Sequence, residues 1–139
     1  MAHRNIRNRA FVLTAVLILS LAIWFAASQH FGRETVFIGS FDISEYSSEA
    51  DEFSYENISG RSRKFGEIAS YEKAGECAEI IWSEMGFETD SKKPYRVYYD
   101  SEKSLWLVTG NLDRDLLGGE PYAVFSENEG EVIAAWHTR

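Results

Sequence analysis

The sequence predicts an α+β protein: one N-terminal transmembrane helix, then an amphipathic helix packed on a four-stranded antiparallel sheet. Three observations lead to this prediction. An uncharged apolar run occupies residues 10–27, a helical apolar stripe occupies residues 70–85, and four β-rich runs lie within residues 95–137. The length of 139 residues suits about one folded domain beside the membrane segment.

Composition and charge argue against several classes of site. The chain has 14 basic and 22 acidic residues, a formal charge of −8, whereas nucleic-acid binding needs a basic surface for the phosphates. The single cysteine, Cys77, cannot form an intrachain disulfide or a cysteine-based zinc site. Asp113 and Asp115 lack the further ligands that calcium needs. We therefore expect no nucleic-acid partner, no metal and no cofactor.

The apolar run at residues 10–27 (AFVLTAVLILSLAIWFAA) contains 18 residues without a charge. This length just suffices for a helix that crosses the hydrocarbon core of a bilayer. Three arginines, Arg4, Arg7 and Arg9, precede the run, and basic residues mark the cytoplasmic side. The prediction is a cytoplasmic basic N-terminus at residues 1–9, a signal anchor at 10–27 and an extracytoplasmic (periplasmic) C-terminal part.

A cleaved signal peptide is the alternative hypothesis for the same run. The small residues Ala26, Ala27 and Ser28 suit a signal peptidase that cuts after Ser28 and releases the rest into the periplasm. Both hypotheses export residues 28–139, which carry 11 basic and 22 acidic residues, a charge of −11. A surface with this charge favours basic partners.

Residues 28–65 are predicted to be an acidic spacer with local structure. Within them, Val36–Ile38 is a candidate short strand. Residues 49–56 (EADEFSYE) are either a short helix or a solvated spacer. The folded domain is expected at residues 66–139.

An amphipathic helix is predicted at residues 70–85. Ser70 suits the N-cap, and Gly86 suits a left-handed C-cap. The intervals of four, three and four residues place the apolar side chains on one face of the helix. These side chains are Ala74, Ala78, Ile81 and Met85. Cys77 lies at the edge of this stripe, where it is expected to pack as a small apolar side chain.

Four β-rich runs follow this helix, at residues 95–99, 105–109, 121–125 and 131–137. Polar connections separate them, and the shortest, Asn128–Gly130, is typical of a hairpin turn. Sequential strands with short turns form an antiparallel meander. We therefore expect the helix to cover one face of a four-stranded sheet.

The order of these elements resembles the bacterial immunity proteins that have a nuclear-transport-factor-2-like (cystatin-like) fold. The resemblance covers residues 66–139. It rests on the helix with Ala74 and Ala78, on Pro94-Tyr95, on Trp106–Gly110, on Gly118-Gly119, and on the closing hairpin Glu129–Ile133 that ends in Trp136-His137. The family's fold implies a curved sheet with more than one helix. A second helical cover comes from residues 40–65, or the domain is a shortened version of the fold.

The resemblance implies a function without catalysis: a membrane-anchored immunity protein that binds and neutralises a cognate bacterial toxin. One alternative is an exported small-ligand-binding or envelope accessory protein that uses a pocket in the curved sheet. The last alternative is an acid–base enzyme, which needs a partner such as Asp100 or Glu120 for His137. No convincing pair of this kind stands out, so we expect no catalytic residues. The sequence leaves the oligomeric state open.

Two sets of residues are candidates for binding. The loop at residues 111–120 is expected to contribute acidic side chains to a protein interface, because loops on a rigid sheet often carry recognition. These side chains are Asp113, Asp115 and Glu120. Large aromatic side chains on the sheet either line a pocket or fill the core. These side chains are Tyr98, Trp106 and Trp136.

Overall fold

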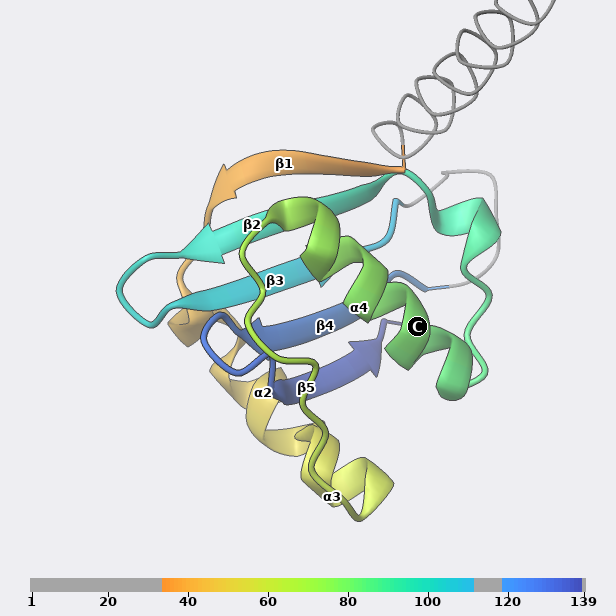
Figure 1. Ribbon diagram of the computed structural model, residues 1–139. Helices are drawn as coiled ribbons and strands as arrows, with labels where there is room; N and C mark the ends of the chain where they lie inside the picture. The colour runs from red at the N-terminus through yellow and green to blue at the C-terminus, as the bar shows by residue number, and fades with distance from the viewer. Residues whose placement is uncertain (1–33, 112–118, 139) are drawn as a thin grey trace, which may run out of the picture. The chain divides into compact units, whose positions relative to one another are not determined.

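The four β-rich runs form four neighbouring antiparallel strands, as the sequence predicts (Figure 1). The computed structural model describes residues 34–111 and 119–138. Within these ranges the strands are β2 (Tyr95–Asp100), β3 (Leu105–Thr109), β4 (Pro121–Ser126) and β5 (Val132–His137). Each strand pairs with the next along the chain, the arrangement that short connections allow.

A fifth strand, β1 (Thr35–Ser40), corrects the predicted strand count and makes the sheet mixed. It pairs in parallel with β2, and the sheet order is β1-β2-β3-β4-β5. The predicted count of four strands is therefore wrong, whereas the antiparallel pairing predicted for β2 to β5 is confirmed. Parallel neighbours need a long crossover, so no nearby turn marks this pairing in the sequence. The candidate strand Val36–Ile38 is the centre of β1.

The predicted amphipathic helix is confirmed as α4 (Tyr71–Glu84). The hydroxyl oxygen of Ser70 accepts a hydrogen bond from the Lys73 N–H at 3.3 Å and caps the helix. Gly86 has a φ of +78°, the left-handed conformation expected after the last turn. The apolar stripe is buried against the sheet, with Met85 partly buried at its end.

The core beneath α4 is apolar and fully excluded from solvent at its centre. Its helix side chains include Cys77, Ile81 and Trp82, and the strands add Tyr95, Val97 and Phe125. Burial raises the pKa of the Cys77 thiol, in keeping with its expected packing role. The Trp82 indole N–H donates to the Tyr122 carbonyl oxygen at 3.1 Å, which fixes α4 on β4.

The opposite face of the sheet has a second, smaller core under short helical segments. These segments are η1 (Ile43–Tyr46) and α2 (Ser47–Glu52). A third short helix, α3 (Tyr55–Ser59), contacts β5, and its Tyr55 belongs to the core under α4. Figure 1 shows α4 crossing one face, while α2 and α3 lie beside β5. Residues 40–65 therefore supply further helical cover, the first of the two alternatives left open by the sequence. A last helical turn, η2 (Asp90–Lys92), precedes β2.

The two edges of the sheet differ. On the β5 side, isolated backbone β-bridges join Ser54 to Ala134 and Lys64 to Glu131. The Val132 N–H also donates to the Arg63 carbonyl oxygen at 2.9 Å. On the other side, no strand of the described residues pairs with the outer edge of β1. The side chains of Val36, Phe37 and Ile38 there are 42–50% exposed.

Glu34–Arg139 forms one compact unit, which includes β1 and all the helices named above. Within the residues that the structure describes, no helix has the length and apolar character needed to cross a membrane. The predicted transmembrane helix at residues 10–27 lies outside the described residues.

Candidate functional site

The face of the sheet opposite α4 carries the aromatic cluster, which consists of Phe41, Tyr46, Tyr98, Tyr122 and Trp136. The rings of Tyr122 and Trp136 stack with centroids 5.0 Å apart and planes 9° apart. Tyr46 packs on both of them at 6.1 and 6.3 Å. Of the cluster, only Trp136 is fully buried, so the other rings present part of their surface to solvent.

Strand pairing and a short capped turn create this cluster. Tyr122 and Trp136 are direct partners in the β4–β5 ladder, so their side chains stand side by side on one face. Tyr46 comes from η1, whose first turn is held by two aspartates. The Asp42 carboxylate accepts from the Ser44 N–H at 2.9 Å, and the Asp100 carboxylate accepts from the Ile43 N–H at 3.2 Å.

The three aromatic residues singled out from the sequence lie on two different faces. Tyr98 and Trp136 belong to the aromatic cluster. Trp106 lies on the α4 face, where its indole N–H donates to the Ile68 carbonyl oxygen at 3.0 Å. Its ring packs against Tyr99 with centroids 4.6 Å apart. These three side chains therefore do not line one common pocket.

An acidic segment, residues 42–56, borders the aromatic cluster. It contains six exposed acidic residues and no basic residue. They are Asp42, Glu45, Glu49, Asp51, Glu52 and Glu56. None of them takes part in an ion pair within the described part of the chain. This segment therefore keeps a strong negative charge next to exposed aromatic surface.

Of the three acidic candidates in the predicted loop, Asp113, Asp115 and Glu120, the structure describes only Glu120. Its carboxylate accepts a hydrogen bond from the Tyr122 hydroxyl at 3.1 Å, so it adjoins the aromatic cluster. Asp113 and Asp115 lie outside the described residues. Burial, followed by the charge of Glu120, raises the pKa of Tyr122. Burial also raises the pKa of Tyr46, with smaller contributions from Glu45 and Glu120.

His137 and Asp100, one of the two pairs considered for acid–base chemistry, stand far apart on the sheet. His137 pairs with Pro121 at the start of β4. Asp100 pairs with Leu105, which in turn pairs with Ser126, so Asp100 lies at the level of the other end of β4. Five residues of strand separate these positions by about 16 Å. The Asp100 carboxylate also accepts from the Glu102 and Lys103 N–H groups at 2.9 and 3.0 Å, which makes it the organiser of the β2–β3 turn.

Sequence reasoning noted the acidity of residues 49–56 but did not connect it with the sheet. It also missed Tyr46 and Tyr122 as site residues. For Tyr122 a signal existed, because alternation along β4 and β5 places Tyr122 and Trp136 on the same face once the hairpin register is known. For Tyr46 there was none, since its place depends on contacts between residues far apart in the chain.

A family model described as "NTF2 fold immunity protein" matches residues 73–139. No curated protein and no solved structure matches the chain. The resemblance predicted from the sequence is therefore confirmed over this range, and it supports a general role in toxin immunity. Tyr98, Tyr122 and Trp136 lie within the matched range, whereas the acidic segment precedes it.

Proposed function

We propose that the protein is a membrane-anchored immunity protein that binds a cognate bacterial toxin and neutralises it without catalysis. The observation that carries this proposal is the family match over α4 and the four antiparallel strands. The match names a role in immunity. The toxin-facing surface, the membrane anchor and the absence of turnover rest on the residues themselves.

The aromatic cluster with its acidic border is the surface we propose for the toxin. Partly exposed Tyr46, Tyr98 and Tyr122 offer large, rigid rings of the kind that form energetic hot spots. The acidic segment and Glu120 surround them as a charged rim. This combination suits a basic toxin, because complementary charge speeds encounter while the buried centre sets the lifetime of the complex.

Inhibition then follows from occlusion alone. A toxin whose active surface faces the immunity protein is blocked for as long as the complex lasts, and no proton or group needs to be transferred. The separation of His137 from Asp100 is consistent with this mechanism. The remaining candidate partner, Glu120, accepts from the Tyr122 hydroxyl instead.

The cellular site of capture follows from residues 10–27. As a signal anchor behind three arginines, this run would hold residues 28–139 outside the cytoplasm. The toxin would then be met in the periplasm, at the membrane. If the chain is instead cut after Ser28, the same domain acts there in released form.

Co-expression with the toxin encoded beside its gene tests the proposal. The full chain should protect cells in proportion to its amount, because each toxin molecule needs one inhibitor. His137→Ala should protect as well as the wild type, since no step uses its imidazole. Protection by substoichiometric amounts of the protein, or its loss in a folded His137→Ala variant, would point to an enzyme and sink the proposal.

A fusion experiment tests the location independently. A reporter that is active only outside the cytoplasm, joined after Arg139, should be active. Replacing Leu17 and Leu19 with Arg should abolish membrane association, because each arginine costs about 3 kcal/mol at the centre of a membrane helix. A C-terminal reporter that works only in the cytoplasm contradicts the proposed orientation but leaves toxin binding untouched.

A further inference from the structure

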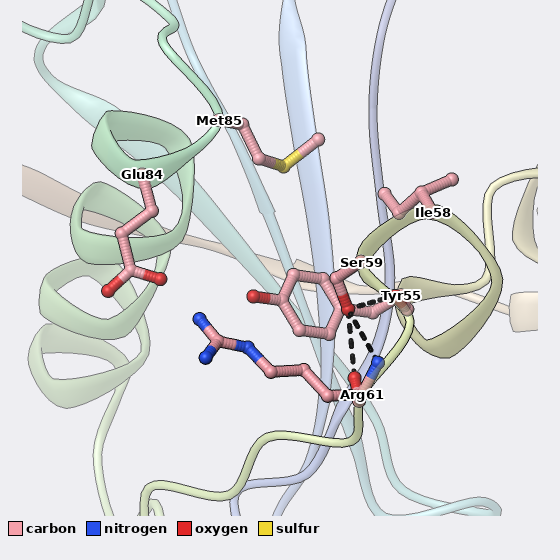
Figure 2. A pocket seen from close by; sticks show the side chains of 6 residues that line it. All are labelled: Tyr55, Ile58, Ser59, Arg61, Glu84 and Met85. Atoms are coloured by element: carbon pink, nitrogen blue, oxygen red, sulfur yellow. Dashed lines mark hydrogen bonds between the residues drawn. The ribbon is translucent and has the colours of Figure 1, made fainter.

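A pocket of about 490 Å³ lies between α3 and the C-terminal end of α4, away from the aromatic cluster. Figure 2 shows the six side chains that line it, contributed by α3, the segment after it and α4. They are Tyr55, Ile58, Ser59, Arg61, Glu84 and Met85. The volume falls in the range of about 300–1,000 Å³ that is usual for small-ligand sites.

One side of the pocket is apolar. The side chain of Ile58 is 44% exposed there, although isoleucine, as an apolar residue, is usually buried in the core of a domain. Met85 and the buried ring of Tyr55 continue this surface. An apolar group that entered the pocket would remove these side chains from water.

The other side offers two hydrogen-bond donors that the described residues leave unused. The Arg61 guanidinium forms no ion pair and no side-chain hydrogen bond within residues 34–111 and 119–138. The Tyr55 hydroxyl likewise has no hydrogen-bond partner in these ranges. Both groups extend toward the same side of the pocket in Figure 2.

The loop that carries Arg61 is held in place. The Ser59 hydroxyl donates to the Tyr55 carbonyl oxygen at 2.6 Å, and the Ser59 oxygen accepts from the Arg61 N–H at 3.4 Å. The backbone next to the two donors is therefore anchored before any ligand arrives, which lowers the entropy cost of binding.

The sign of the local charge favours an anion. The Glu84 carboxylate at the rim already binds the Arg63 guanidinium at 2.5 Å, and Arg63 lies over the Phe65 ring at 4.9 Å. Arg61, Arg63 and Glu84 together carry one net positive charge, and within the described residues no carboxylate pairs with the exposed Arg61. In a domain whose surface is otherwise strongly acidic, this is a local cationic site.

We propose that this pocket binds an apolar group that carries one carboxylate, with the carboxylate on Arg61 and Tyr55 and the apolar body on Ile58 and Met85. An arginine guanidinium matches a carboxylate with two parallel hydrogen bonds. The group comes either from a free small carboxylate or from an exposed side chain of the toxin. The pocket site itself stands independently of the proposed immunity function, and only the toxin as the source of the carboxylate rests on that function.

The test uses 3-phenylpropionate as the probe and the full chain as the protein, with every variant in the same non-ionic detergent. Ligand-observed NMR at millimolar probe should detect binding to the wild type. Arg61→Ala should weaken it about tenfold, the usual cost of losing a hydrogen bond to a charged group. Ile58→Ser should weaken it by a similar factor. The neutral amide of the probe should not bind measurably.

Matched controls separate the pocket from general effects. Arg96→Ala removes an exposed guanidinium elsewhere, and Ile80→Ser removes an isoleucine that is 41% exposed on α4 and does not line the pocket. Both should bind the probe like the wild type. Equal binding by all variants, or none by the wild type, overturns the proposal.

Adding the toxin distinguishes the two sources of the carboxylate. Release of bound probe by one equivalent of toxin assigns the pocket to the toxin interface, and simultaneous binding assigns it to a free ligand. Release of the probe and simultaneous binding are both possible only if the probe binds in the pocket. If the immunity proposal alone fails, cells are not protected from the toxin in the co-expression experiment, while the probe still binds to the pocket.

Discussion

The two faces of the sheet are built for different tasks. Under α4, aliphatic and aromatic side chains alike are closed off from solvent, and Ala78, Ile81 and Trp82 are fully buried. On the opposite face, large rings stack on one another and remain partly exposed under short, strongly acidic helical segments. The α4 face therefore contributes mainly stability, and the aromatic face keeps surface available for a partner.

This difference also shows where substitutions should act. A substitution beneath α4 changes side chains that are packed out of contact with water, so it should lower the free energy of unfolding. A change of charge on the acidic segment alters a solvated surface, so it should affect association with a partner while the fold persists.

Ile81→Asp should give the largest loss, about 4 kcal/mol of unfolding free energy, because it buries a carboxylate without a partner in the α4 core. Ile80→Asp is the matched control, one residue away on the exposed side of the same helix. It should cost only about 0.5 kcal/mol through helix propensity. Urea unfolding of both variants measures the difference, and equal losses would show that α4 is not packed as described.

Gly75→Ala should destabilise the protein by about 1–3 kcal/mol through overpacking. A methyl group at this position would lie 2.5 Å from the Thr35 hydroxyl oxygen, because the α4 backbone packs directly on β1 here. The double variant Gly75→Ala/Thr35→Ala should recover part of the loss, since it removes the opposing atoms. Thermal unfolding measures this coupling, and strictly additive effects would exclude the close contact.

The two faces should also respond to alkaline pH through one tyrosine each. Burial raises the pKa of both Tyr95 and Tyr122 above the unperturbed value of 10.0. Because the folded state holds these protons more tightly than the unfolded state, their contribution is complete below pH 10 and is lost as the pH rises above it. Each group can change the unfolding free energy by up to about 1.4 kcal/mol per pH unit.

Tyr95→Phe and Tyr122→Phe should therefore each flatten the alkaline fall in stability. Phe41→Leu, which changes the aromatic cluster without a titratable hydroxyl, should keep the wild-type slope. Urea midpoints measured from pH 8 to pH 11 give these slopes. An unchanged slope in both tyrosine variants would mean that neither hydroxyl is buried in the folded state.

Glu49→Lys/Asp51→Lys should have the smallest effect on stability, within about 0.5 kcal/mol, because both side chains are exposed and unpaired in the described structure. The same variant should be the most impaired in toxin capture among the folded variants. Circular dichroism melting checks the first statement. A large loss of stability would mean that the acidic segment is part of the structural core.

Local pattern predicted much of the fold. The stripe at Ala74, Ala78 and Ile81 and the cap at Ser70 predicted α4, and short turns predicted the order of β2 to β5. The strand β1 could be named only as a candidate, because its partner β2 lies far along the chain and the parallel pairing leaves no turn signal.

The candidate site was predictable only in part. Tyr98, Trp106 and Trp136 were singled out from the sequence as aromatic residues of the sheet. Composition cannot tell which face a side chain occupies, and Trp106 lies on the opposite face from the other two. That assignment needs the register, which shifts between Val124 and Phe125 in the β4–β5 pair. The nearness of the acidic segment to the sheet depends on long-range contacts of η1 and α2.

On this account, the aromatic cluster with its acidic border captures a basic toxin. The most direct measurement is the association rate constant of the full chain with the toxin encoded beside its gene, by stopped-flow fluorescence at several salt concentrations. Glu49→Lys/Asp51→Lys should reduce this constant about tenfold at low salt, with the difference fading as salt screens the charges. The control Glu67→Lys/Glu76→Lys changes the net charge equally on other surfaces and should have a much smaller effect. Equal rates for the two double variants at every salt concentration would contradict the account.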